Sequence, residues 1–175
     1  MVRGNSVARL AESYMRKTNS SMQLTRAADY GVRVMIHLAA NGESRKSLVD
    51  LAAATNSPES FLSKVMQALS RAGLISSRRG QSGGFRISTL GRAASILDVI
   101  EAVDGRVCLN KCLVAANSCS RKLVCPAQLV WVDAQRAMLQ VLHAAKIANL
   151  AAGSQLIHAN EQSCESCHSC QCLPS

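Results

Sequence analysis

The chain has 175 residues, of which 20 are lysine or arginine and 11 are aspartate or glutamate, giving a formal net charge of +9 at pH 7. Such a surplus of positive charge is typical of proteins that bind polyanions, above all nucleic acid. The sequence has no apolar run near the ~18 residues of a membrane-spanning helix, and its start lacks the apolar core of a secretory signal. We therefore expect a cytoplasmic protein without a membrane partner, whose eight cysteines serve metal or redox chemistry rather than structural disulfides.

The first 21 residues carry four basic side chains and one acidic side chain, and they show no pattern of a packed element. We expect range 1–21 to be a disordered extension. Met22 resembles a natural domain start, so translation from Met22 is an alternative. A basic arm that touches DNA phosphates is another interpretation of the same residues.

Two helices are predicted after Met22. Thr25 is placed to cap a helix that runs to about Ala40, and Ser47 with Asp50 forms a capping-box-like start for a short second helix. The apolar residues of the first helix recur at helical spacing and predict an inward face. That face consists of Val34, Met35 and Leu38, together with Tyr30 and Gly31.

A third helix is predicted to follow the cap residue Ser57, to have Pro58 as its first residue and to end at Gly73. Its buried stripe is expected to be Leu62, Val65, Met66 and Leu69. Five other side chains, Arg71 among them, are left largely on the outward side, and four of these are expected to face the major groove as on a recognition helix. These four are Ser60, Phe61, Lys64 and Gln67.

Two short β-prone runs, 74–79 and 85–88, flank a glycine-rich turn and predict a β-hairpin. Helix, short helix, capped helix and hairpin in this order indicate a winged helix-turn-helix. Between Ser60 and Leu97 there are six basic residues and no acidic one. Such a run is usually a solvated face, but its coincidence with the motif favours DNA binding. We expect the wing to reach phosphates and the minor groove through Arg78, Arg79, Gln81 and Ser82, with Gly83 and Gly84 allowing close approach.

A further amphipathic helix is predicted over residues 95–104, and a long helix is predicted to open at Pro126 and run to about Ala151. Along the long helix, apolar residues alternate steps of four and three, the a/d pattern of a coiled-coil seam. They are Val130, Ala134, Ala137, Val141, Ala144 and Ala148. The pattern favours a homodimer, although packing on the same chain would produce the same stripe.

Three cysteines between these two helices have the spacing C-x6-C-x5-C, at Cys112, Cys119 and Cys125, with Cys108 just upstream. These gaps are too long for the knuckles of a structural zinc site. They suit a loop around an inorganic cluster, for which thiolates are the standard ligands. Three buried or idle thiols are the alternative. Four more cysteines lie in the tail 153–175, which is either a metal-binding or thiol-reactive segment or a disordered end without a role.

Five blocks occur in the order found in one known family: MQLTRAADYGVRVMIHLA from Met22, SPESFLSKVMQALSRAGLI from Ser57, RRGQSGGFRI from Arg78, ILDVIEAVDG from Ile96, and the three-cysteine loop. Together they resemble the Rrf-type bacterial transcription regulators over roughly Met22 to Ala152. The resemblance implies a homodimer of winged helix-turn-helix domains that binds operator DNA. It also implies an iron–sulfur cluster, 2Fe–2S or 4Fe–4S, held in the loop before the dimerisation helix.

The resemblance implies a set of cluster ligands as well. The three cysteine ligands of the family are matched by Cys112, Cys119 and Cys125. IscR-like members have a histidine shortly after the third cysteine, which is absent from residues 126–128 here. NsrR-like members use an aspartate early in the first helix of the partner subunit, and Asp29 matches that position. An ion pair with Arg33 is the alternative role of Asp29, and Cys108 is either a spare thiol or a ligand in a shifted register.

We expect a mainly α protein with a small β-hairpin wing. Its predicted parts are a disordered extension (1–21), a winged helix-turn-helix domain (22–105), a cysteine loop (106–127), a dimerisation helix (128–152) and a disordered cysteine-rich tail (153–175). The expected function is a repressor without enzymatic activity or small-molecule substrate, responding to nitric oxide, redox state or iron and cluster supply. The alternatives are a cluster-free regulator with a thiol switch or zinc site, and a redox protein that works through its tail.

Overall fold

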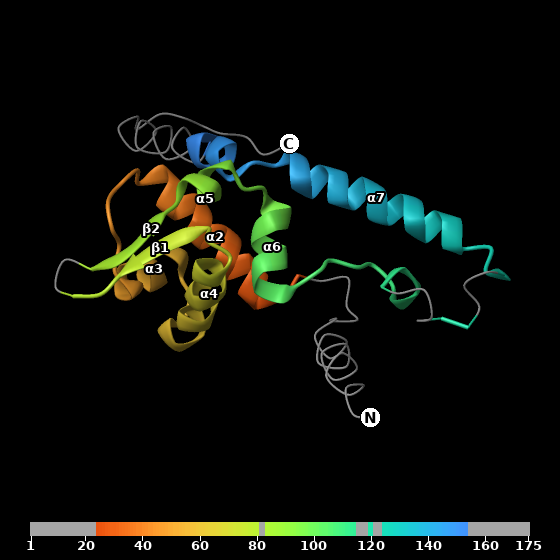
Figure 1. The fold of residues 1–175 in the computed structure, drawn as a ribbon, viewed down its shortest axis with the longest axis horizontal. Coiled ribbons are helices and arrows are strands. Elements are labelled where there is room, and N and C mark those ends of the chain that lie inside the picture. The colour runs from red at the N-terminus through yellow and green to blue at the C-terminus, as the bar shows by residue number, and fades with distance from the viewer. Residues whose placement is uncertain (1–23, 81–82, 115–118, 121–123, 154–175) are drawn as a thin grey trace, which may run out of the picture.

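The computed structural model describes residues 24–80, 83–114, 119–120 and 124–153. The helices are α2 (Arg26–Ala40), α3 (Leu48–Thr55), α4 (Glu59–Arg71), α5 (Thr89–Ala93), α6 (Ile96–Asp104), the 3₁₀ turn η1 (Lys111–Leu113) and α7 (Gln128–Ala144), and the strands are β1 (Ile75–Arg78) and β2 (Gly84–Ile87). A winged helix-turn-helix domain forms one end of the molecule, and α7 projects from it beside the cysteine loop (Figure 1). The predicted fold class is confirmed. The predicted extension 1–21 and the four cysteines of the tail lie outside the described residues.

Side-chain caps begin three of the helices where the sequence predicted their starts. Thr25 Oγ1 accepts a hydrogen bond from the backbone N–H of Ala28 at 3.1 Å. Ser47 and Asp50 form a reciprocal capping box at the start of α3, and Ser95 and Asp98 form another at the start of α6. These bonds satisfy backbone donors that have no partner inside the helix, so local sequence fixes where each helix begins.

The core of the domain lies where α2, α4 and α6 pack against one another. The predicted inward faces of α2 and α4 are confirmed, because their residues are buried, apart from Tyr30, which is half-buried against the core. Fully burying a side chain of this size contributes about 1.5–3 kcal/mol. The core therefore holds α4 in place by its inner stripe while its opposite side faces solvent.

The wing is an antiparallel hairpin in which Ile75 pairs with Ile87 and Arg78 pairs with Gly84. A third segment that the sequence did not reveal joins it: Lys46 N–H donates to Phe85 O at 2.9 Å, and Phe85 N–H donates to Lys46 O at 2.9 Å. These two bonds attach strand β2, close to the turn of the wing, to the segment between α2 and α3. The position of the wing is therefore set by the helix-turn-helix itself.

The prediction that Ser57 caps the third helix is wrong. The helix α4 is preceded by Pro58, which makes no side-chain cap. The Ser57 hydroxyl is buried instead, accepting a hydrogen bond from Thr55 Oγ1 at 3.0 Å and donating one to Thr55 O at 3.2 Å. The tight turn between α3 and α4, with Asn56 in a left-handed conformation, directs the serine inward.

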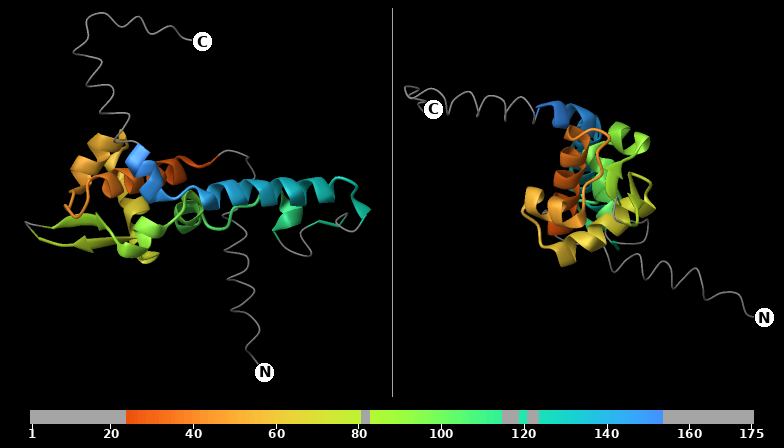
Figure 2. Two further views of the ribbon diagram at one scale, coloured as in Figure 1. Left: turned by 90° about the horizontal axis from the view of Figure 1, so that it is seen from above. Right: turned by 90° about the vertical axis from the view of Figure 1, so that its left-hand side faces the viewer.

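The long C-terminal helix is not continuous, in contrast to the prediction. Helix α7 ends at Ala144, and Ala145 adopts an extended conformation. Residues 147–153 are helical again, and Ile147 is completely buried in the winged-helix domain. Backbone bonds hold the break, since Ile96 N–H donates to Ala145 O and Ile147 N–H donates to Ala94 O, both at 2.9 Å. Burial of Ile147 thus turns the chain back, and α7 extends away from the domain (Figure 2).

The capping box of α6 gives the stability of the domain a dependence on pH. Burial alone would raise the pKa of Asp98, but hydrogen bonds from Ser95 and the positive charges of Lys146 and His143 outweigh it and lower the pKa. The carboxylate therefore stabilises the fold above its unfolded-state pKa, and this contribution is lost as the pH falls through the lower, folded-state pKa.

We expect Asp98→Asn to lower the free energy of unfolding at pH 7 by about 1 kcal/mol, the scale of helix caps. The difference from the wild type should shrink at acidic pH, when the wild-type carboxylate is itself protonated. Denaturant unfolding at pH 7 and at acidic pH measures the free energies of unfolding of the wild type and of Asp98→Asn. Asp133→Asn on the exposed surface of α7 is the control, and a loss independent of pH would contradict the assignment to the ionised carboxylate.

Within the part of the chain that the structure describes, no helix combines the length and apolar character needed to span a membrane.

Candidate DNA-binding surface and cysteine loop

The outward side of α4 carries the four side chains that the sequence assigned to it. Ser60, Phe61, Lys64 and Gln67 are all exposed, because the stripe between them is packed in the core. Phe61 also makes a contact with α2 that the sequence did not predict. Its ring meets the ring of Tyr30 on α2 edge to face, with centroids 5.8 Å apart and an interplanar angle of 82°. Phe61 therefore fixes the start of α4 against α2 while remaining 42% exposed.

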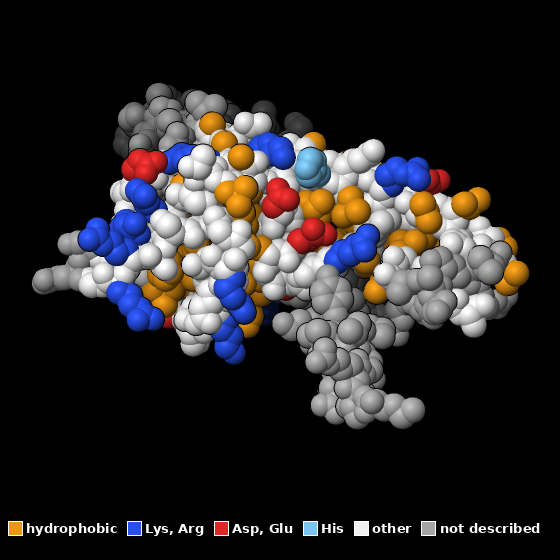
Figure 3. Space-filling view, in the orientation of Figure 1, with side chains coloured by type: hydrophobic (Ala, Val, Ile, Leu, Met, Phe, Trp, Pro, Cys, Tyr) orange, Lys and Arg blue, Asp and Glu red, His pale blue; other side chains and the backbone are white. Residues whose placement is uncertain are grey.

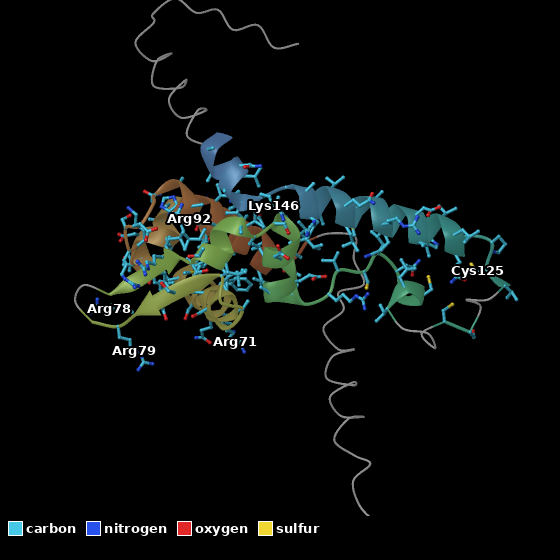
Figure 4. All side chains as sticks on the ribbon, turned by 45° about the horizontal axis from the view of Figure 1, so that its top comes forward. Arg71, Arg78, Arg79, Arg92, Cys125 and Lys146 are labelled. Carbon is cyan, nitrogen blue, oxygen red and sulfur yellow. The ribbon has the colours of Figure 1, made fainter. Side chains whose placement is uncertain are left out.

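A groove of about 540 Å³ lies between α4 and the wing. Among its lining residues, Met66 and Phe85 are apolar, whereas Arg71, Arg78 and Arg79 are exposed cations. Figure 4 shows these three arginines along one side of the domain, with Arg92 and Lys146 in another part of the molecule. Arg71 was expected to point outward but was not assigned to the site, and the groove brings it together with the predicted wing arginines.

The basic residues of the 60–97 stretch fall into two groups. Arg86 and Arg92 each pair with Glu43, at 3.3 and 3.4 Å. Among the described residues, no acidic side chain forms an ion pair with the other four, which are Lys64, Arg71, Arg78 and Arg79. Lysine and arginine side chains gather over this end of the molecule (Figure 3). The free cations therefore lie on α4 and the wing, where phosphate contacts were predicted.

The wing glycines are required by the hairpin itself. A Cβ atom on Gly83 would lie 2.4 Å from Arg78 O, and one on Gly84 would lie 2.7 Å from Lys46 O. Gly84 also has a φ of +131°, which other residues rarely adopt. The sequence-based reason for these glycines was close approach to DNA, and the structure adds this internal one. Gln81 and Ser82 lie outside the described residues.

The cysteine loop connects α6 to α7. Cys108, Cys112, Cys119 and Cys125 are free thiols, and each is half-buried. Turn η1 contacts α7, and Cys125 lies at the end of α7 remote from the winged-helix domain (Figure 4). Within the described part of this single chain, no three cysteine, histidine or acidic residues gather closely enough to hold a metal ion.

Cys108 differs from the other thiols in its electrostatic setting. Burial raises its pKa, Arg106 lowers it in part, and Glu101 adds to the increase. A raised pKa favours the protonated thiol, which is a poorer ligand and nucleophile than the thiolate. Of the two roles considered for Cys108, this setting favours the spare thiol over the ligand.

Asp29 is half-exposed on the first turn of α2, and its carboxylate forms an ion pair with Arg33 at 2.8 Å. Both side chains are about half accessible to solvent, at 46% and 52%. Pairs of this kind contribute about 0.3–0.5 kcal/mol to stability, so Arg33 holds Asp29 only weakly. The carboxylate is accessible to a second molecule.

These features define a winged helix-turn-helix protein with a basic reading surface and a projecting helix. The chain belongs to the Rrf2 family of iron-dependent transcriptional regulators, whose sequence model matches residues 24–153. The expected regulator class, rather than an enzyme, is thereby confirmed. The chain is similar to the transcriptional regulator NsrR of Geobacillus kaustophilus, with 34% identity over 131 residues that cover 74% of this chain and 89% of NsrR.

Two further relatives show how far the similarity extends. Protein aau3 of Rhizobium meliloti is 33% identical over 96 residues, which cover 55% of this chain and 62% of that protein. Among solved structures, CymR (YrzC), the global cysteine regulator of B. subtilis, superposes with a TM-score of 0.60 at 27% identity. That match covers 75% of this chain and 98% of CymR.

Proposed function

We propose that this regulator is a homodimeric repressor whose binding to operator DNA is controlled by an iron–sulfur cluster. The four cations around α4 and the wing, which have no acidic partner in the described part of the chain, carry the DNA-binding part of the proposal. The cysteine loop and the accessible Asp29 support the cluster part.

On DNA, α4 enters the major groove with its outward side. Lys64 and Gln67 present donor and acceptor groups to base edges, and Gln67 has the geometry that suits adenine. Arg78 and Arg79 contact the backbone phosphates beside the groove, and Arg71 adds a cation at the rim between helix and wing. Phosphate contacts supply salt-dependent affinity, and base contacts supply specificity.

Dimerisation occurs through α7. Five residues of the predicted seam, from Val130 to Ala144, lie on α7 and are exposed in the single chain, with Val130 and Val141 65% and 69% accessible. Ala148 is also exposed but lies beyond the break at Ala145. No residue of α7 is buried in this chain. A row of apolar and small side chains on a projecting helix favours a second copy of the same helix as the partner. Two-fold pairing presents two α4 helices to two half-sites.

We expect Val141→Glu to give a monomer, because pairing would bring two carboxylates together in an apolar seam. Light scattering after gel filtration measures the mass. Affinity for duplex DNA should fall by about two orders of magnitude as bivalent binding is lost. Gln140→Glu adds the same charge beside the seam and should remain dimeric, and a dimeric Val141→Glu would exclude this interface.

In the cluster site, the thiolates of Cys112, Cys119 and Cys125 are the protein ligands, and the fourth is Asp29 of the partner subunit. When bound, the cluster supplies a centre that reacts with oxidants and nitric oxide. The donor set fits such a group: the three thiols are free and half-buried, and the carboxylate is held only by Arg33. As a ligand, Asp29 would have to leave its ion pair with Arg33, and it would hold the cluster through an oxygen that exchanges more readily than a thiolate.

Helix α2 links the cluster site to the outward side of α4, which binds DNA. Asp29 is followed by Tyr30, whose ring packs on Phe61 at the start of α4. A shift of the first turn of α2 therefore moves the start of α4. The DNA-binding surface therefore has two positions. In one, Asp29 is bound at the cysteine loop of the other subunit, and in the other, Asp29 is not bound there.

A cluster-free thiol switch is the second candidate function. It is favoured by one observation, that four free thiols share one loop whereas no three potential ligands meet within the described part of a single chain. Anaerobic purification followed by a visible spectrum and iron and sulfide analysis separates the two. Broad absorption with acid-labile sulfide supports the cluster. A colourless protein that cannot be reconstituted would leave the thiol switch.

A further inference from the structure

Gln135, on the side of α7 that faces the cysteine loop, binds the backbone on both sides of Cys108. Its Oε1 accepts a hydrogen bond from Leu109 N–H at 2.7 Å, and its Nε2 donates to Val107 O at 2.8 Å. Only one orientation of the amide satisfies both bonds, because the flipped amide would place oxygen against oxygen and nitrogen against nitrogen. The Gln135 side chain thus accepts one backbone N–H and donates to one backbone C=O of the loop, as the backbone of a neighbouring β-strand would.

These two hydrogen bonds of Gln135, which we call the clamp, join residues far apart in the sequence. Leu109 and Val107 are separated from Gln135 by 26 and 28 positions. The segment that it closes, 109–135, contains all three candidate cysteine ligands. Closing a loop of this length reduces the number of conformations open to the chain between its ends. The clamp therefore restricts the space in which the three thiolates move.

The start of the loop is also fixed to the winged-helix domain. Thr25 Oγ1 donates to a carboxylate oxygen of Asp104 at 2.6 Å, which connects the first residue before α2 to the last residue of α6. A longer contact of 3.5 Å joins Val107 N–H to Glu101 Oε1. The loop thus leaves the domain from a fixed point and is next fixed to α7 by Gln135.

We infer that Gln135 is a positioning residue for the cluster, holding the cysteine loop on the dimerisation helix so that the thiolates and α7 move together. The inference rests on the proposed function. It assigns Gln135 no bond to the cluster. Its role is to set where the backbone of the loop lies when the ligands bind, and to transmit a change in the loop to the helix that pairs the two subunits.

The test replaces Gln135 with leucine, which keeps the size of the side chain and removes both hydrogen bonds. Gln140→Leu is the matched control, because Gln140 is exposed on the same helix. The first readout is the visible circular dichroism of the reconstituted dimer, which reports ligand geometry. The second is the half-life of its absorbance in air. In Gln135→Leu, we expect an altered dichroism spectrum and a loss of the cluster absorbance in air about tenfold faster than in the wild type, the scale set by two lost hydrogen bonds. Gln140→Leu should behave like the wild type in both measurements.

A readout that needs no cluster keeps the two proposals separate. Trypsin cuts after Arg106 and Lys111, releasing a peptide whose only cysteine is Cys108. In the full-length protein freed of iron, alkylation of this thiol by iodoacetamide, followed by digestion and mass spectrometry, should be several-fold faster in Gln135→Leu. Gln135→Glu keeps the acceptor for Leu109 but cannot donate to Val107, so its alkylation should also be faster. Thermal unfolding verifies that each variant folds.

Equal Cys108 alkylation in the wild type and Gln135→Leu would overturn the inference, and so would equal cluster half-lives with unchanged dichroism. If the wild type binds neither iron nor sulfide, the proposed function fails, and with it the role of Gln135 at a cluster. The alkylation ratio then still shows whether Gln135 holds the loop.

Discussion

Replacing Arg78 and Arg79 together with alanine is expected to weaken binding to duplex DNA about 10- to 100-fold at moderate salt. Both side chains are exposed on the rim of the groove between α4 and the wing, and neither has an acidic partner among the described residues. Each phosphate contact that is lost should reduce the slope of log affinity against log salt by about 0.9, so the double variant should lose about 2. Fluorescence anisotropy across a salt series measures both quantities, using a duplex selected from a random library.

Arg92→Ala is the matched control, because Arg92 pairs with Glu43 and lies away from the wing arginines (Figure 4). It removes one positive charge from the same basic stretch, where the double variant removes two, and it should leave the salt slope close to that of the wild type. A loss in the control half as large as that in the double variant would mean that net charge, rather than the wing surface, governs binding. An unchanged slope in the double variant would place the phosphate contacts elsewhere.

Cys119→Ala is expected to abolish the cluster. Cys119 is the middle thiol of the loop, and its loss leaves two cysteines and one exchangeable carboxylate. Iron and acid-labile sulfide per protomer should fall by more than about tenfold, since even residues behind the ligands alter metal affinity 10- to 100-fold. Metal analysis and the visible spectrum of anaerobically purified protein measure the effect.

Two variants show whether this loss is specific. Cys108→Ala should retain the cluster, because Cys108 is outside the proposed ligand set and burial raises its pKa. Asp29→Ala should retain the fold and bind the cluster less stably, with an altered response. Cluster loss in Cys108→Ala together with retention in Cys119→Ala would place Cys108 in the ligand set in place of Cys119. An unchanged response in Asp29→Ala would remove Asp29 from the site.

The winged-helix domain was predictable because short-range patterns determine it. The caps at Thr25, Ser47 and Ser95 satisfy backbone groups within three residues, and the stripe from Leu62 to Leu69 follows helical periodicity. These features need no knowledge of the rest of the chain. The exposure of Lys64 and Gln67 follows from the same periodicity, so the outward side of α4 could also be read from the sequence.

Long-range contacts account for what the sequence did not reveal. Nothing local marks Lys46 as a partner of Phe85, or Gln135 as a partner of the backbone around Cys108. The end of α7 at Ala144 accompanies the burial of Ile147 in the core of the winged-helix domain, which overrides a helical pattern that continues through the break. In each case, tertiary contacts rather than local propensity determine the conformation.

The cluster site is incomplete in a single chain for a similar reason. Cys112, Cys119 and Cys125 lie on one loop, whereas Asp29 reaches the loop only from a second subunit in our proposal. In that proposal, pairing of the α7 helices brings the cysteine loop and Asp29 together. The ligand set is therefore a property of the dimer, and it was the family resemblance that suggested Asp29.

The most direct test of cluster control compares one preparation in two states. The anaerobically purified dimer is divided into two halves. One half is treated with a chelator and an oxidant until its iron is lost, and its cysteines are then reduced with thiol. Both halves are titrated with the same labelled operator duplex. We predict that the affinities differ by at least about tenfold, within the 5- to 150-fold range of typical allosteric coupling. Equal affinities with and without iron and sulfide would contradict cluster control while leaving the winged helix as the DNA-binding element.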